Sequence, residues 1–64
     1  MNEPPVAPML YRVEEAAEAL RMSKSRVYEL IRSGRLRTVK EGRARLVPIT
    51  ALAEYVALLE GEAA

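Results

Sequence analysis

The most informative part of the chain is a run near its middle, Ser23-Lys24-Ser25-Arg26-Val27-Tyr28-Glu29-Leu30-Ile31-Arg32-Ser33-Gly34. Val27, Leu30 and Ile31 recur at helical spacing, so the pattern predicts a helix over residues 24–33 that turns these three side chains toward a core. Gly34 follows the helix at the position where a left-handed C-cap is needed. The run therefore predicts a short helix with a defined end.

A second helix is predicted just before it, over residues 13–21. Its apolar stripe follows i, i+3, i+4, i+7 spacing and consists of Val13, Ala16, Ala17 and Leu20. Ser23 is a good N-cap for the helix that follows, so the link between the two helices is only about three residues long. Two short helices joined this tightly must cross steeply, which is the helix-turn-helix geometry.

The periodicity changes after Gly34. Residues 36–40 and 43–47 are β-prone, and Gly42 between them can adopt the positive φ that a tight hairpin demands. Pro48 is expected to end the second strand, Thr50 to cap a third helix over 51–60, and Gly61 to stop it. The predicted buried stripe of that helix is Leu52, Tyr55, Val56 and Leu59.

The predicted fold class is mainly α with a small β-hairpin, in the order helix, helix, hairpin, helix, which is a winged helix-turn-helix. The division we expect is a flexible proline-rich tail over residues 1–9, a winged helix-turn-helix DNA-binding domain over 10–60 and a C-terminal tail over 61–64. With 64 residues, the chain has room for one small domain.

The composition excludes several classes of function. The chain has no cysteine and no histidine, which removes disulfides, thiolates, histidine-ligated metals and the commonest general base. There is no run of 18 apolar residues and no signal-peptide pattern at the N-terminus. We therefore expect a soluble, cytoplasmic, non-enzymatic protein with no cofactor, no small-molecule ligand and no membrane contact.

The net charge of +1 conceals a separation of the charges along the chain. The segment from Arg21 to Arg45 has nine basic residues against Glu29 and Glu41, a net charge of +7, whereas the remaining residues carry −6. Eight of the ten basic residues are arginine, which forks onto phosphate and guanine edges better than lysine does. One basic face that attracts a polyanion explains this separation better than a mixed, solvated surface does.

The candidate DNA-binding residues belong to the 24–33 helix and to the segment that follows it. In the helix they are Ser23, Lys24, Ser25, Arg26, Tyr28 and Arg32; beyond it they are Arg35, Arg37, Lys40, Arg43 and Arg45. Arg26 and Lys24 are expected to donate to guanine, Tyr28 to meet a phosphate or a thymine methyl, and Arg32 to reach the backbone. Arg43 and Arg45 are expected to point the same way by strand alternation and to form a cationic wing, although charged strands also protect exposed sheet edges.

Two stretches, residues 10–20 and 22–36, resemble the excisionase family of small DNA-binding proteins, which have a MerR-like winged helix-turn-helix. Residues 42–48 and 51–56 are similar to that family's wing and closing helix. The most specific part is the Val27-Tyr28-x-Leu30-Ile31-x-Ser33-Gly34-x-Leu36 run. The chain departs from the family at Arg12, where a Ser or Thr cap is usual, and at Leu46 and Ile49, where basic or polar residues are frequent.

The resemblance implies a recombination directionality factor, a protein that binds and bends attachment-site DNA, several copies side by side, and directs an integrase toward excision without cutting DNA itself. The implied partners are double-stranded DNA, an integrase and further copies of the chain. The resemblance also implies a bacterial cell, with a phage- or mobile-element-encoded chain among the alternatives. Two alternatives remain open from the sequence: a small transcription regulator built on the same domain, and a protein–protein adaptor without DNA contact.

Overall fold

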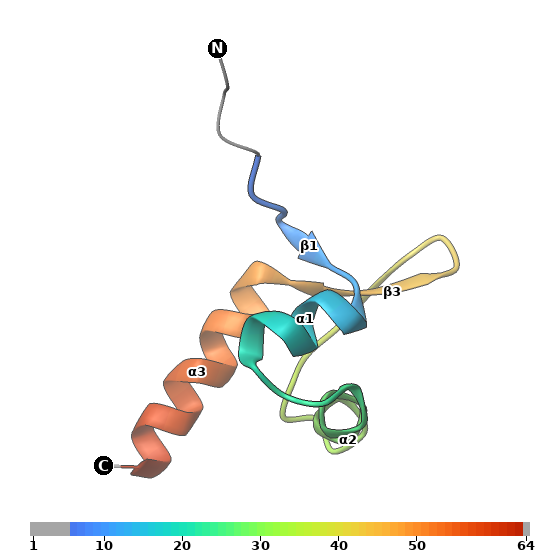
Figure 1. Cartoon of the computed structure of the whole chain (residues 1–64). Coiled ribbons are helices and arrows are strands. Elements are labelled where there is room, and N and C mark those ends of the chain that lie inside the picture. The colour runs from blue at the N-terminus through green and yellow to red at the C-terminus, as the bar shows by residue number, and fades with distance from the viewer. Residues whose placement is uncertain (1–5, 64) are drawn as a thin grey trace.

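The computed structural model describes residues 6–63, which form three helices and a three-stranded antiparallel sheet (Figure 1). In chain order the elements are β1 (Leu10–Tyr11), α1 (Val13–Leu20), α2 (Lys24–Arg32), β2 (Val39–Glu41), β3 (Ala44–Pro48) and α3 (Ile49–Ala63). The predicted order of helix, helix, hairpin and helix is confirmed, and the architecture is that of a winged helix-turn-helix. None of the helices within these residues is long and apolar enough to cross a membrane.

The turn between α1 and α2 is tight because Arg21 adopts a left-handed conformation, with φ of 58°. Its amide donates to the Glu18 carbonyl at 3.1 Å, and the Met22 amide donates to the Ala17 carbonyl at 2.9 Å. This pair of hydrogen bonds is the Schellman pattern, which ordinarily uses glycine. The sequence did not indicate it, because an arginine at this position carries no left-handed signal.

The first turn of α1 compensates for Arg12, whose side chain has no hydroxyl that could cap the helix. The Glu15 carboxylate accepts a hydrogen bond from the Arg12 amide at 2.8 Å, so a residue inside the first turn reaches back to the N-cap backbone. Its negative charge also suits the positive end of the helix dipole. The expected weakness at this end is therefore offset by a neighbouring side chain.

The hairpin lies slightly later in the chain than predicted. Leu36, expected in the first strand, is buried instead, and its amide donates to the Leu30 carbonyl at 3.1 Å, so it belongs to the cap of α2. The strands begin at Val39 and Ala44 and are joined by a two-residue turn, Gly42-Arg43. Gly42 has φ of 60°, as the sequence predicted.

The sheet contains a strand that the sequence analysis did not identify. Leu10 pairs with Pro48 and Tyr11 with Val47, which makes β3 the central strand in the order β1-β3-β2. The Met9 carbonyl also accepts a hydrogen bond from the Ile49 amide at 2.9 Å. A strand of two residues is too short for alternation to show in the sequence, so only the pairing reveals it.

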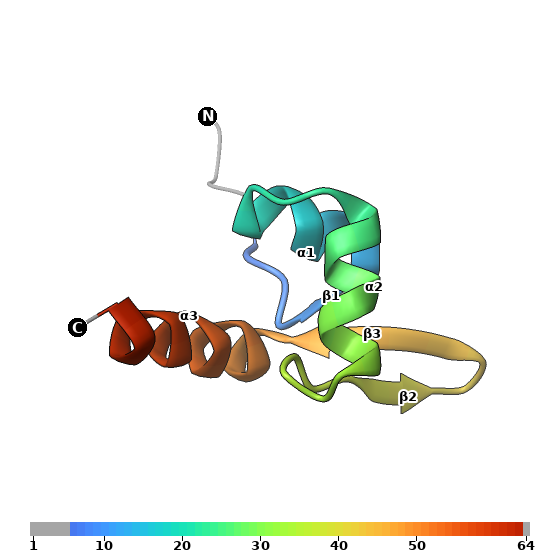
Figure 2. The ribbon, with the colours of Figure 1, turned by 90° about the horizontal axis from the view of Figure 1, so that it is seen from below.

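Helix α3 differs most from its prediction. It begins at Ile49, so Thr50 lies inside the first turn and is not the cap, and it continues through Gly61 to Ala63. Its buried residues are Ala51, Leu52 and Tyr55, whereas Val56 and Leu59, predicted to be buried, are 41% and 36% exposed. The reason is that the second half of the helix extends away from the hairpin tip (Figure 2), so the core covers only its first half.

The proposed tails are only partly covered by the structure. Residues 1–5 and 64 lie outside the described residues, and residues 6–9 are exposed and without regular structure. At the other end, residues 61–63 are helical rather than an irregular tail.

The hydrophobic core packs α2 and β3 against α1 and α3. Its buried side chains are all hydrophobic: Val13, Ala16, Ala17, Val27, Leu30, Leu36, Val47, Ala51, Leu52 and Tyr55. The predicted inward stripe of α2 is confirmed, since Val27 and Leu30 are buried and Ile31 packs against the core. Burying this stripe fixes which face of α2 looks outward.

Candidate nucleic-acid interface

The outward face of α2 carries polar and aromatic side chains. Because Val27 and Leu30 point inward, the helical repeat leaves Lys24, Tyr28 and Arg32 aligned along the exposed side, one turn apart. Ser25 is exposed beside them, and Tyr28 is 44% exposed in spite of its large ring. An exposed helix face with cations at both ends and a tyrosine between them suits a DNA groove.

The N-terminus of α2 is capped as the sequence predicted. The Ser23 hydroxyl oxygen accepts a hydrogen bond from the Arg26 amide at 3.1 Å. The Ser23 hydroxyl proton remains available as a donor, so the same group can cap the helix and donate to a phosphate. This end of the helix also presents the positive end of its dipole.

The Arg26 side chain has a partner within its own helix. Its Nη1 atom donates to Oε1 of Glu29 at 3.2 Å, and both side chains are more than half exposed. An exposed ion pair of this kind is weak and exchanges readily. A guanine in contact with Arg26 would therefore compete with Glu29 for the same guanidinium.

The hairpin brings two cations directly opposite one another. Lys40 and Arg45 are paired across β2 and β3, so their side chains emerge on the same face of the sheet, the face on which Val47 is buried. Glu41, the neighbouring carboxylate, alternates to the other face. In the part of the chain that the structure describes, neither cation has an ion pair.

Arg43 belongs to the wing, but it lies in the turn and not in the strand where it was predicted. It is the second residue of the two-residue turn, so the expectation that strand alternation aligns it with Arg45 is wrong. Lys40 lies on the same face as Arg45 instead, and Arg43 sits at the tip of the hairpin, which projects past one side of α2 (Figure 2). We call Lys40, Arg43 and Arg45 the wing cations.

Arg35 and Arg37 face α3. Arg35 Nη2 donates to both carboxylate oxygens of Glu62, at 2.8 and 2.9 Å. Arg37 donates to both oxygens of Glu54, from Nε at 3.2 Å and from Nη2 at 3.0 Å, and also to the Thr50 hydroxyl at 3.1 Å. We call these two residues the loop arginines.

These hydrogen bonds raise the pKa of both loop arginines above the ordinary value. For Arg35 the main cause is the hydrogen bond to Glu62, followed by its charge; for Arg37 it is the hydrogen bond to Glu54, again followed by its charge. Both guanidinium groups therefore stay cationic. Their predicted contact with DNA stays a prediction, and it would compete with these carboxylates.

The partners of the loop arginines were missed at the sequence level. One signal was present for Glu54, which lies on a predicted helix without a basic residue. Glu62 gave no such signal, because the helix was expected to stop at Gly61, whereas it continues to Ala63 and places Glu62 two turns after Glu54. Thr50, expected to cap α3, instead supplies a hydroxyl to Arg37.

A helix-turn-helix followed by a cationic hairpin defines the class of winged helix-turn-helix proteins. Residues 10–57 match the family described as "Helix-turn-helix domain". The chain is 41% identical over 51 residues to a protein named "Probable excisionase" from Saccharopolyspora erythraea, which covers 80% of this chain and 52% of that protein. It is 40% identical over 58 residues to an "Excisionase" from Streptomyces ambofaciens, covering 91% of this chain and 94% of the relative.

The chain therefore belongs to the excisionase family of small helix-turn-helix DNA-binding proteins. It spans about half the length of the Saccharopolyspora relative and nearly all of the Streptomyces one. No solved structure matches it significantly.

Proposed function

We propose that this chain is an excisionase that binds attachment-site DNA in the bacterial cytoplasm and directs an integrase toward excision. In this proposal α2 enters the major groove while the wing follows the phosphates or the adjoining minor groove. The names of both relatives support this function. The chain acts by binding, and the integrase carries out the chemistry.

The observation that carries the proposal is the opposition of Lys40 and Arg45. Like charges directly opposite each other destabilise a sheet, and neither of these two cations has an ion pair among the described residues. Protecting a sheet edge needs only one charge and does not need Arg43 at the tip. A phosphate backbone lying against the wing removes the repulsion, because it supplies the missing negative charge.

Base recognition is assigned to the first turn of α2. On DNA, the Arg26 guanidinium leaves the Glu29 carboxylate and donates to the O6 and N7 atoms of a guanine. Ser25 and Tyr28 lie beside Arg26. Because Lys24 lies in one exposed row with Arg32, we place it on a phosphate together with Arg32 and Ser23, instead of on the guanine that the sequence suggested. A module this small makes few base contacts, so we propose that several copies bind side by side and bend the DNA to gain specificity.

A salt titration tests DNA binding and counts its contacts. Binding of the full chain to a duplex from the attachment region is measured by fluorescence anisotropy at increasing salt. Five phosphate contacts, from Lys24, Arg32 and the wing cations, give a slope of log K against log salt of about −4.5, and the two loop arginines would bring it to about −6. A slope near zero would contradict DNA binding and favour the adaptor alternative.

An excision assay separates the excisionase from the transcription regulator. The chain is produced together with the integrase encoded beside its gene, and loss of the integrated element is scored by PCR across the junction. An excisionase increases excision strongly over integrase alone. Tight DNA binding without any increase would identify the regulator instead.

A further inference from the structure

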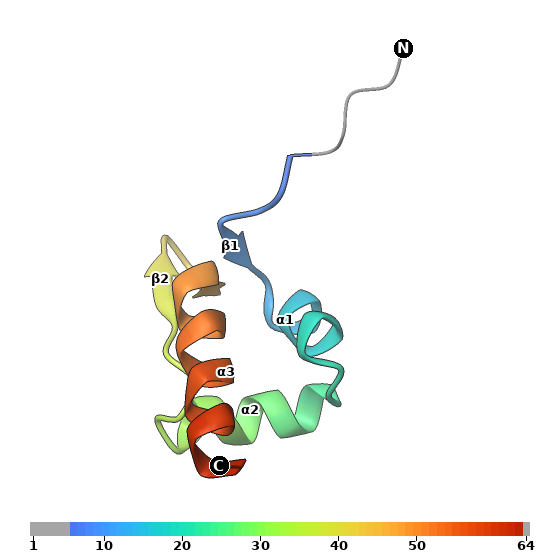
Figure 3. The same ribbon diagram turned by 90° about the vertical axis from the view of Figure 1, so that its left-hand side faces the viewer.

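Helices α1 and α3 both pack against β3 (Figure 3). Side chains of the two helices line an open groove. The groove has a volume of about 410 Å³, and its lining is almost entirely apolar. Ala19 and Leu20 of α1 form one wall, and Ile49, Leu52, Ala53 and Val56 of α3 form the other. Nothing in the DNA-binding proposal uses this groove.

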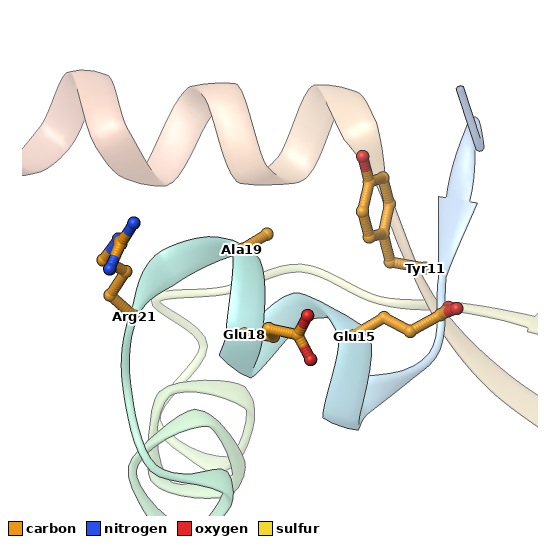
Figure 4. Close-up of a pocket in the computed structure, with 5 residues that line it drawn as sticks. All are labelled: Tyr11, Glu15, Glu18, Ala19 and Arg21. Carbon is orange, nitrogen blue, oxygen red and sulfur yellow. The ribbon is translucent and has the colours of Figure 1, made fainter. Parts of the chain in front are cut away.

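A second, more polar cavity of about 590 Å³ adjoins the groove at Ala19, which lines both. Tyr11 of β1 points its hydroxyl toward α3, and the carboxylates of Glu15 and Glu18 project from α1 below it (Figure 4). Arg21 stands at the end of α1. The combined surface therefore has an apolar floor with polar, mainly acidic, edges.

The charges of the two helices limit what can occupy this surface. Within their bounds α1 and α3 carry six glutamates and no lysine or arginine. Glu54 and Glu62 are paired with the loop arginines, whereas Glu18 and Glu60, which border the groove and its polar extension, have no ion pair among the described residues. Nucleic acid is repelled by such a surface. Two copies meeting face to face would bring acidic edges together, since a two-fold contact opposes the same patch on each side.

We propose that the α1–α3 groove binds an amphipathic helix of a partner protein, whose apolar stripe fills the groove and whose lysine or arginine residues face Glu15, Glu18 and Glu60. Ile49 and Val56 are seven residues apart and 36% and 41% exposed, so they repeat on the face that such a helix would cover. This is the helix-in-groove mode of recognition, with the carboxylates setting the sign of the partner's charge. The inference does not rest on DNA binding.

Two designed peptides and two variants test the proposal. The probe is a synthetic helix of about 15 residues with a leucine stripe flanked by lysines, and its control has glutamate in place of every lysine. Each is titrated into the isotope-labelled full chain while backbone NMR shifts are followed. The basic peptide should bind with a Kd on the order of 10–100 μM and shift the amides of residues 19–20 and 49–57, and the acidic peptide should not bind.

The variants Val56→Lys and Leu58→Lys form a matched pair. Both residues are 41% exposed on α3, but only Val56 lines the groove. Val56→Lys should weaken peptide binding at least about tenfold and Leu58→Lys by less than about twofold, while both keep the parent's DNA affinity. Equal effects of the two variants, or equal binding of the two peptides, would overturn the proposal. So would a dimer in sedimentation equilibrium that Val56→Lys alone dissociates, because a second copy would then be the occupant.

Discussion

Two pairs of arginines with the same spacing have different surroundings in this molecule. The loop arginines, Arg35 and Arg37, each donate two hydrogen bonds to a carboxylate of α3. Arg43 and Arg45 of the wing have no ion pair in the described residues, and Arg45 lies opposite a lysine. Charge counting treats the two pairs alike. The neighbouring elements decide which pair is free for a polyanion.

The difference follows from the local backbone. Arg35 and Arg37 flank the buried Leu36, so the burial of one side chain turns both of its neighbours outward, toward the acidic face of α3. In the wing, Glu41 alternates away from Lys40 and Arg45. Thus carboxylates of α3 pair with the loop arginines, whereas no carboxylate within residues 6–63 pairs with the wing cations.

The largest effect should come from Leu30, which shares the core with Leu36 of the loop and Val47 of β3. Leu30 is 1% exposed, and its carbonyl accepts hydrogen bonds from the Arg35 and Leu36 amides. Leu30→Ala should lower the free energy of unfolding by about 2–5 kcal/mol, a large share of the roughly 3–10 kcal/mol expected for a domain of this size. Urea denaturation measures the loss, and the exposed Leu58→Ala is the control, expected to change stability by less than about 0.5 kcal/mol. A loss as small as the control's would mean that Leu30 does not support the fold.

The next largest effect should be on DNA binding, from removal of the wing arginines. Replacing Arg43 and Arg45 by alanine removes two phosphate contacts, so affinity near 0.15 M salt should fall by about 30-fold on any sequence. The slope of log K against log salt should become shallower by about 2. Anisotropy with specific and scrambled duplexes measures both quantities. An unchanged slope would show that the hairpin is not a wing.

Much of this surface could be predicted from the sequence, because its determinants are local. Helical spacing placed Val27 and Leu30 inward and so exposed Lys24 and Tyr28, and Ser23 signalled the start of α2. Gly42 marked the turn because only glycine adopts positive φ without strain.

Features set by contacts between distant segments could not be predicted in this way. Strand β1 exists only through its pairing with β3, and the ion pairs of the loop arginines join residues 17 and 27 positions apart. The buried stripe of α3 was predicted with the right period but with too many residues. Periodicity shows which side chains share a face of the helix, but not how far along the helix the rest of the protein covers that face, and Val56 lies where it is exposed.

A smaller effect, confined to the preferred site, is expected from Arg26. Arg26→Ala should cost about 1–3 kcal/mol on the cognate duplex and relax the preference at one base pair, with little change on scrambled DNA. Competition binding with a set of single-base variants of the site measures this preference. Glu29→Gln, which removes the competing carboxylate but keeps Arg26, is the matched control and should retain the preference. A uniform loss on all sequences would assign Arg26 to a phosphate.

The smallest effect on DNA binding should come from the loop arginines, although their double variant removes as much charge as the wing variant. With both guanidinium groups held by α3, replacing Arg35 and Arg37 by alanine should change DNA affinity by less than about threefold and leave the salt slope unaltered. Hydrogen exchange in the second half of α3 should accelerate, because the Glu62 contact that holds it is lost.

The control is the double variant Glu54→Gln and Glu62→Gln, which keeps both arginines and loosens the same helix. If the alanine variant instead flattened the slope by about 2, the loop arginines would leave their carboxylates for phosphates on binding, and the contrast with the wing would hold only in the free protein.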